Sequence, residues 1–186
     1  MKKVILKHDE IQTICQDIGQ KITNELTHEE RIPIVVGIMK GALNFMTDLV
    51  KYINTNIFLD YIQVSSYNGT STTGRVILKR DLSFDVNNRT MILVEDVIDT
   101  GISMNYLLHF IHDRYHPKRV ILVTLFDKKC RRKMDVKIDY TGKVLEGDDF
   151  LFGYGLDYNE IGRNLPDVYG LDSSEIIALQ DQIKRD

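Results

Sequence analysis

Three carboxylates stand close together at one point of the chain. Glu95 and Asp96 follow an apolar run at 91–94, and Asp99 comes just before Gly101. Carboxylate oxygens are hard ligands that hold Mg²⁺ directly or through its waters, and they also accept hydrogen bonds from sugar hydroxyls. So many acids at the end of a predicted strand need a counter-charge. The cluster therefore indicates a binding site.

A turn and a helix are expected directly after these acids. Gly101 suits the turn because glycine tolerates positive φ. Met104, Leu107, Leu108 and Ile111 recur at the spacing of one helical face. The unpaired N–H groups at a helix N-terminus favour an anion such as phosphate. A phosphorylated sugar together with Mg²⁺ would satisfy both the N–H groups and the acids.

Strands and helices alternate along the chain and position this cluster. Apolar stretches predict strands at 32–38, 56–64, 76–78, 91–94, 120–126 and 150–152. Helical spacing predicts helices at 9–26 (with Asp9 as N-cap), 43–53, 102–114 and 174–183. The pattern predicts an α/β fold with a mainly parallel central sheet flanked by helices, whose ligands bind beyond the carboxyl ends of the strands. The polar stretch 65–75 is expected to be a mobile loop.

Composition is that of an ordinary globular protein. A length of 186 residues predicts a single domain over 1–186, and no apolar run is long enough to cross a membrane. The net charge of -3 argues against a general nucleic-acid binder. The basic cluster at 128–133 follows a predicted strand, which gives it a possible role other than binding RNA. Cys15 and Cys130 lack metal-ligand spacing, which indicates reduced thiols in a cytoplasmic protein.

The segment around the three acids resembles the phosphoribosyl pyrophosphate motif of the purine phosphoribosyltransferases. The match comprises an apolar strand, Glu95-Asp96, two apolar residues, Asp99-Thr100-Gly101, one residue and Ser103. The resemblance implies that the ribose and its 5′-phosphate are bound by Glu95, Asp96, Asp99, Thr100, Gly101, Ile102 and Ser103. It further implies that Asp99 is the catalytic base and that Glu95 and Asp96 hold Mg²⁺.

A second match lies at the end of the strand predicted at 32–38. The segment resembles the family's pyrophosphate-binding loop, which implies that Met39, Lys40 and Gly41 bind the leaving group together with Arg163. In this family the peptide bond before the lysine is often cis. We therefore expect a cis bond between Met39 and Lys40.

Two further segments resemble the family's purine-binding site. An ammonium group donates hydrogen bonds and accepts none, so Lys128 suits O6 of hypoxanthine or guanine and does not suit the amino group of adenine. Lys129 is the alternative, because the family's pattern is broken at that position. The resemblance also implies that Phe150 stacks on the purine, that the Leu151 backbone binds its edge, and that Asp157 holds a second Mg²⁺.

The resemblance covers residues 34–163 and implies the activity of a hypoxanthine-guanine phosphoribosyltransferase. Such an enzyme uses phosphoribosyl pyrophosphate and Mg²⁺ to convert hypoxanthine or guanine into IMP or GMP, releasing pyrophosphate. Family members usually form homodimers or homotetramers, and a small hood is expected from the N- and C-terminal segments. A loop carrying Ser66 and Tyr67 is expected to close over the centre and exclude water. The alternatives are an inactive nucleotide-sensing regulator with the same fold and a xanthine-preferring transferase.

Overall fold

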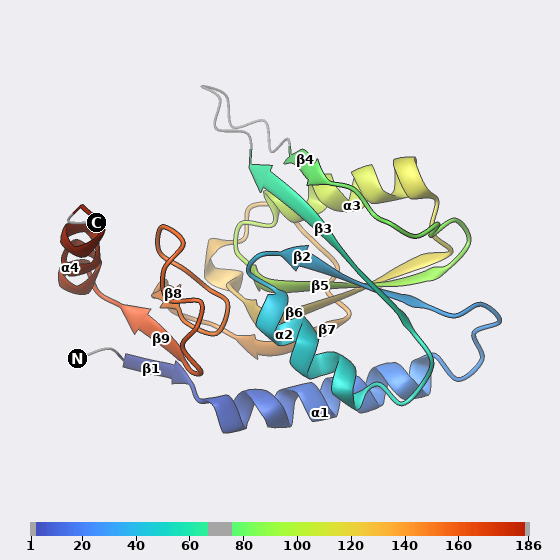
Figure 1. Ribbon diagram of the computed structural model, residues 1–186, viewed down its shortest axis with the longest axis horizontal. Helices are drawn as coiled ribbons and strands as arrows, with labels where there is room; N and C mark the ends of the chain where they lie inside the picture. The colour runs from blue at the N-terminus through green and yellow to red at the C-terminus, as the bar shows by residue number, and fades with distance from the viewer. Residues whose placement is uncertain (1–2, 67–75, 185–186) are drawn as a thin grey trace.

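The structure, a computed structural model, describes residues 3–66 and 76–184. Two β-sheets of unequal size dominate it (Figure 1). Within the described residues, the central sheet consists of β2 (Ile34–Met39), β3 (Phe58–Ser66), β4 (Val76–Arg80), β5 (Thr90–Ile98), β6 (Arg119–Asp127) and β7 (Tyr140–Val144). Their order is β4-β3-β2-β5-β6-β7. Neighbouring strands are parallel, except that β4 pairs antiparallel with β3 at one edge.

Continuous apolar sequence explains why the inner strands lie at the centre. Residues 34–38 of β2 and 90–94 of β5 are buried along their whole length, so both of their faces are covered. Because parallel neighbours run in the same direction, their carboxyl ends meet at one edge of the sheet. At that edge β2 ends at Met39, β5 at Ile98 and β6 at Asp127.

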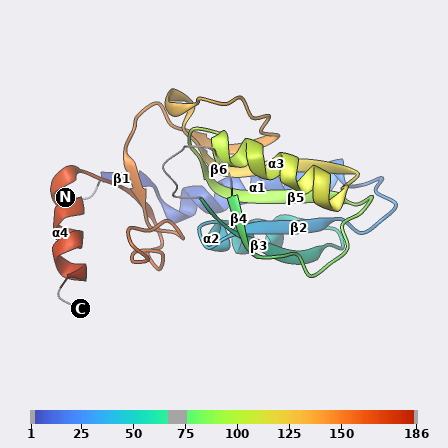
Figure 2. The same cartoon turned by 90° about the horizontal axis from the view of Figure 1, so that it is seen from above.

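Helices cover both faces of the central sheet. Helices α1 (His8–Glu25) and α2 (Leu43–Leu49) lie on one face and α3 (Ile102–Tyr115) on the other (Figure 1 and Figure 2). Successive side chains of β5 point to opposite faces of the sheet, so they pack alternately against the helices on each face. Ile92 and Val94 pack in the cluster that contains α1 and α2, whereas Met91 and Leu93 pack with α3. The predicted fold class is therefore confirmed.

A smaller sheet forms the expected hood. It consists of β1 (Lys3–Leu6), β8 (Phe150–Phe152) and β9 (Val168–Leu171) in the order β1-β9-β8, followed by α4 (Ser173–Ile183). Figure 1 shows this sheet beside the carboxyl ends of the central strands, at the left of the view. The first and last parts of the chain thus meet next to the edge where the predicted site lies.

The predicted end of β5 is wrong. The strand was expected to stop at residue 94, before the acids, but it continues to Ile98. Backbone pairing with β6, in which Val97 lies opposite Phe126 and Ile98 opposite Asp127, keeps this part extended. Glu95 and Asp96 are therefore held by a strand and have less freedom than residues of a loop.

The predicted loop at 65–75 begins too early. Ser66 ends β3 and pairs with Val76 of β4, so its backbone belongs to the sheet and not to a mobile loop. Tyr67 and the rest of that loop lie outside the described residues, and its expected closure stays a prediction. Strands β1, β7 and β9 were not predicted, because each is short and mixes apolar residues with polar residues or glycine.

Two helix boundaries also differ. Helix α1 begins at His8 with Lys7 as its N-cap, so the prediction of Asp9 as the cap is wrong. The carboxylate of Glu10 accepts the N–H of Lys7 at 2.9 Å, which stabilises this earlier start. Helix α2 ends at Leu49 and continues as a short 3₁₀ turn, Val50–Tyr52. No helix in the described part of the chain is long and apolar enough to span a bilayer.

Candidate active site

The turn between β5 and α3 is fixed by its backbone. Gly101 has φ of 80°, and a Cβ there would overlap the carbonyl oxygen of Met134. The carbonyl oxygen of Thr100 accepts the N–H groups of Lys133 and Met134, at 2.9 and 3.0 Å. Conformation and close packing therefore both require glycine at this position.

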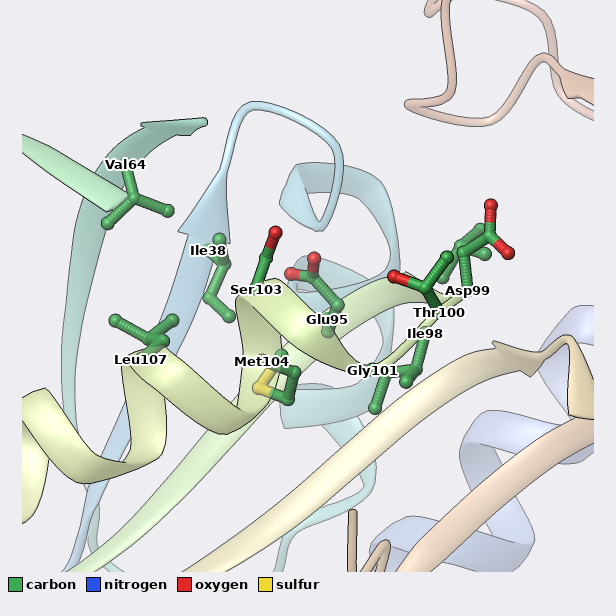
Figure 3. Close-up of a pocket in the computed structure, with 11 residues that line it drawn as sticks. Ile38, Val64, Glu95, Ile98, Asp99, Thr100, Gly101, Ser103, Met104 and Leu107 are labelled. Atoms are coloured by element: carbon green, nitrogen blue, oxygen red, sulfur yellow. The ribbon is translucent and has the colours of Figure 1, made fainter. Parts of the chain in front are cut away.

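The N-terminus of α3 opens into a cavity of about 250 Å³. Its polar lining comes from Glu95, Asp99, Thr100, Gly101 and Ser103, and its apolar lining includes residues of β2, β3 and α3. Figure 3 shows the Ser103 hydroxyl and the Glu95 carboxylate pointing in the same direction, whereas Asp99 lies apart from them at the rim. The first N–H groups of α3 also face outward from its N-terminus. The cavity thus combines anion-binding N–H groups with carboxylates, as the sequence predicted.

Glu95 and Asp96 are neighbouring carboxylates that, among the described residues, form no ion pair within 4.0 Å. Burial, together with the charge of Asp96, holds the pKa of Glu95 well above its usual range. Burial raises the pKa of Asp96 to about 6, against the lowering effects of the Val97 N–H and Arg163. Among the described residues, Oε2 of Glu95 has no hydrogen-bond partner. Both side chains would be stabilised by a cation.

The predicted pyrophosphate loop lies beside these acids. The expected cis peptide bond between Met39 and Lys40 is present. A second cavity of about 260 Å³ is lined by Met39, Gly41, Asp96 and Arg163, among others, and shares Glu95 and Ser103 with the first. A Cβ at Gly41 would overlap the carboxylate of Asp96. The absence of a side chain at Gly41 therefore allows the loop to approach the acids.

Ion pairs connect the pyrophosphate loop to the segment after β8. Lys40 Nζ lies 2.9 Å from Oε2 of Glu160, and Arg163 Nη2 lies 2.7 Å from Oδ1 of Asp157. Arg163 also contacts Glu160 at 3.2 Å and donates to the Gly155 carbonyl at 2.6 Å. Asp157, expected to hold a second Mg²⁺, thus pairs with Arg163. Glu160 was given no role from the sequence, since a lone acid in a polar turn carries no signal.

The predicted purine-binding residues meet at the end of β6. Lys128 is buried, and its Nζ donates to the carbonyl oxygen of Asp149 at 2.7 Å, which leaves further donors for a ligand. Lys129 is exposed and lines a different surface hollow. Phe150 is 38% exposed and meets the ring of Tyr158 edge to face at 5.7 Å. Leu151 is buried in the same strand. This arrangement favours Lys128 over Lys129 as the lysine that faces a base.

The residues fit a magnesium ion that a substrate helps to hold. Among the residues that the structure describes, no three His, Cys, Asp or Glu side chains gather closely enough to hold a metal ion alone. Mg²⁺ is usually bound by one or two carboxylates together with phosphate oxygens and water. The unpartnered oxygen of Glu95 and the neighbouring Asp96 supply hard ligands of this kind. Metal binding is therefore expected to depend on the phosphorylated substrate.

Comparison with protein families gives one extended match. Residues 2–161 match the model of the phosphoribosyl transferase domain. The hypoxanthine-guanine phosphoribosyltransferase of Bacillus subtilis is 40% identical over 167 residues, which is 89% of this chain and 91% of that protein. The bifunctional protein TilS/HprT of Listeria monocytogenes is 43% identical over 167 residues, and there the chain spans only 25% of the longer protein.

Solved structures agree with this match. A hypoxanthine phosphoribosyltransferase from Staphylococcus aureus has a TM-score of 0.87 and 37% identity, covering 94% of this chain and 93% of the other. The hypoxanthine phosphoribosyltransferase from Trypanosoma cruzi in complex with the product IMP has a TM-score of 0.85 and 27% identity, covering 92% and 95%. The likeness thus extends over nearly the whole chain.

Proposed function

This chain belongs to the phosphoribosyltransferase family, and from that membership we propose that it converts hypoxanthine or guanine into IMP or GMP in purine salvage. Phosphoribosyl pyrophosphate is the donor and pyrophosphate the second product. The observation that carries this proposal is the cavity at the N-terminus of α3, where the start of the helix, Ser103 and the acids Glu95 and Asp99 line one space. These groups suit a 5′-phosphate and ribose hydroxyls.

Asp99 is the proposed general base. The purine N9 forms a bond to C1′ of the ribose while the bond from C1′ to the pyrophosphate oxygen breaks. The proton that the imidazole ring loses passes to the carboxylate of Asp99 and later to solvent. Lys128 donates to O6 of the purine, and Phe150 stacks on the ring. These roles support selectivity for 6-oxopurines, because adenine has a donor where Lys128 needs an acceptor.

Lys40 and Arg163 are proposed to bind the departing pyrophosphate. Both pair with Glu160, and substrate binding is proposed to exchange these ion pairs for phosphate contacts. Glu95 and Asp96 would hold Mg²⁺, and Asp157 would hold a second ion. When bound, Mg²⁺ supplies positive charge to the phosphate oxygens. Since burial raises the pKa of both Glu95 and Asp96, a bound cation would also stabilise their charged forms.

The partner of this chain is proposed to be a second copy of itself. Leu59 and Tyr61 project from the same face of β3 and are 48% and 41% exposed. Covering such residues in a homodimer or homotetramer would remove apolar surface from water. Light scattering after size exclusion measures the mass directly, and a monomer at micromolar concentration would contradict this proposal.

We also propose that residues 1–186 form a single domain and that the protein works in the cytoplasm.

An assay with four purines tests the activity. The protein is incubated with phosphoribosyl pyrophosphate, Mg²⁺ and either hypoxanthine, guanine, xanthine or adenine, and the release of pyrophosphate is measured. We expect turnover with hypoxanthine and guanine and none with adenine. A preference for xanthine would identify the xanthine-specific alternative. No turnover with any purine, despite binding of the donor, would identify the inactive regulator.

A further inference from the structure

An arginine after β6 contacts the proposed general base. Arg131 lies in the 3₁₀ turn Lys129–Arg131. Its Nε lies 3.0 Å from Oδ1 of Asp99, and its Nη1 donates to Oδ1 of Asp148 at 2.9 Å. One guanidinium therefore joins Asp99 to the segment that precedes β8. The sequence signalled this arginine only as a member of the basic cluster at 128–133.

The two oxygens of Asp99 have different surroundings. Oδ1 is buried and, within the described residues, accepts no hydrogen bond of good geometry, so its polar contact is the ion pair with Arg131. The side chain as a whole is still 40% exposed, which leaves Oδ2 as the accessible oxygen. Figure 3 shows the carboxylate at the rim of the cavity, pointing away from Val64 and Leu107. One oxygen is held against a cation and the other is open.

The charge of Arg131 is secure. Its hydrogen bond to Asp148 and the charge of Asp99 both raise the pKa of the guanidinium. The segment that carries Arg131 is also attached to the residues before β8, because Lys128 donates to the Asp149 carbonyl at 2.7 Å. Cys130 Sγ lies 3.7 Å from the carbonyl oxygen of Gly147 in the same pair of segments. The backbone that carries Arg131 is thus held by contacts of the residues just before it.

We propose that Arg131 is a positioning residue for the general base, holding Oδ1 of Asp99 so that Oδ2 faces the purine and accepts its proton. This inference rests on the proposed function. It assigns Arg131 an effect on proton transfer, which acts through Asp99 and requires no contact with the substrate. A purely structural role would instead require Arg131 only as a link between residues 128–131 and Asp148. The two roles are separable, because different nitrogens make the two contacts.

Steady-state kinetics with hypoxanthine, saturating phosphoribosyl pyrophosphate and Mg²⁺ separate these roles. Arg131→Ala is expected to lower kcat about tenfold while KM for the donor changes less than about twofold. Arg131→Lys, which keeps a cation near Asp99, is expected to restore kcat to within about threefold of the parent chain. Asp148→Asn removes the other ion pair and is expected to keep kcat within the same range. Arg114→Ala is the matched control, since Arg114 is a similarly exposed arginine, paired with Asp81 near the far end of α3.

A double mutant tests whether Arg131 acts through the base. If it does, Arg131→Ala in an Asp99→Asn chain causes almost no further loss. The inference would be overturned if the kcat loss of the double variant equalled the product of the two single losses. It would also be overturned by a normal kcat in Arg131→Ala, or by a kcat loss in Asp148→Asn as large as that in Arg131→Ala. If alanine disturbs folding, as circular dichroism would reveal, Arg131→Gln replaces it with the same expectations. Failure of the proposed function is distinguishable, because the unsubstituted chain would then release no pyrophosphate with any purine.

Discussion

Asp96→Asn is expected to make the metal-free chain more stable. The carboxyl pKa of Asp96 is raised from 3.8 to about 6 by burial, so the folded chain binds this proton more tightly than the unfolded chain does. Stability therefore falls as pH rises from about 4 through 6, and the full cost is present above that range. The asparagine removes the charge, and its side-chain oxygen can still accept the Val97 N–H, which donates to Asp96 at 2.8 Å.

The expected gain in the free energy of unfolding follows from the raised pKa of Asp96. A rise from 3.8 to about 6 corresponds to about 3 kcal/mol when the carboxylate is charged, and solvent around this partly exposed side chain reduces the value to about 1–2 kcal/mol. For a chain of this length, that gain raises Tm by about 2–8 °C. We expect the gain near pH 7.5, and a smaller one near pH 5, where Asp96 is already largely protonated.

Differential scanning calorimetry in EDTA at both pH values measures this effect. Asp17→Asn is the control, because Asp17 is an exposed acid paired with Lys21 on α1 at 2.6 Å and its loss should shift Tm only slightly. The same Asp96 variant should lose most of the stabilisation that Mg²⁺ and phosphoribosyl pyrophosphate give the parent chain. A variant that is less stable than the parent, or equally stabilised at both pH values, would refute the reasoning.

Three further substitutions test the other parts of the site. Asp99→Asn should lower kcat by about 10² to 10⁴ and leave donor binding largely intact, and near-normal turnover would remove Asp99 from the base role. Lys128→Ala should raise KM for hypoxanthine and guanine at least tenfold, whereas the same result in Lys129→Ala alone would transfer the assignment to Lys129. Gly101→Ala should abolish donor binding in a titration, because a Cβ there meets the Met134 carbonyl oxygen; unchanged affinity would contradict the proposed phosphate cradle.

The sequence predicted the parts of this molecule whose signal is local. Apolar runs located β5 and β6, and glycine with helical periodicity located the start of α3. The end of β5 could not be predicted, since the pairing of Ile98 with Asp127 depends on a strand distant in sequence. The hood was expected from the resemblance, but its strands β1 and β9 could not be predicted from local sequence, because β1 pairs with β9 across nearly the whole chain.

The candidate site likewise contains residues that the sequence identified and residues that it did not. Asp99 and Lys128 were identified by resemblance, and the structure brings them to neighbouring strand ends. The partners that hold the site residues were not identified. Glu160 pairs with Lys40, and Arg131 pairs with Asp99, across long separations and without a spacing pattern. Contacts of this kind follow from the fold alone.

Calorimetric titration of the chain with phosphoribosyl pyrophosphate tests the central claim most directly. If the turn between β5 and α3 binds a phosphorylated ribose beside the acids of β5, one donor binds per chain, and binding weakens strongly when Mg²⁺ is removed. Absence of binding heat with Mg²⁺ present at several temperatures, or equal affinity with and without the ion, would contradict the account.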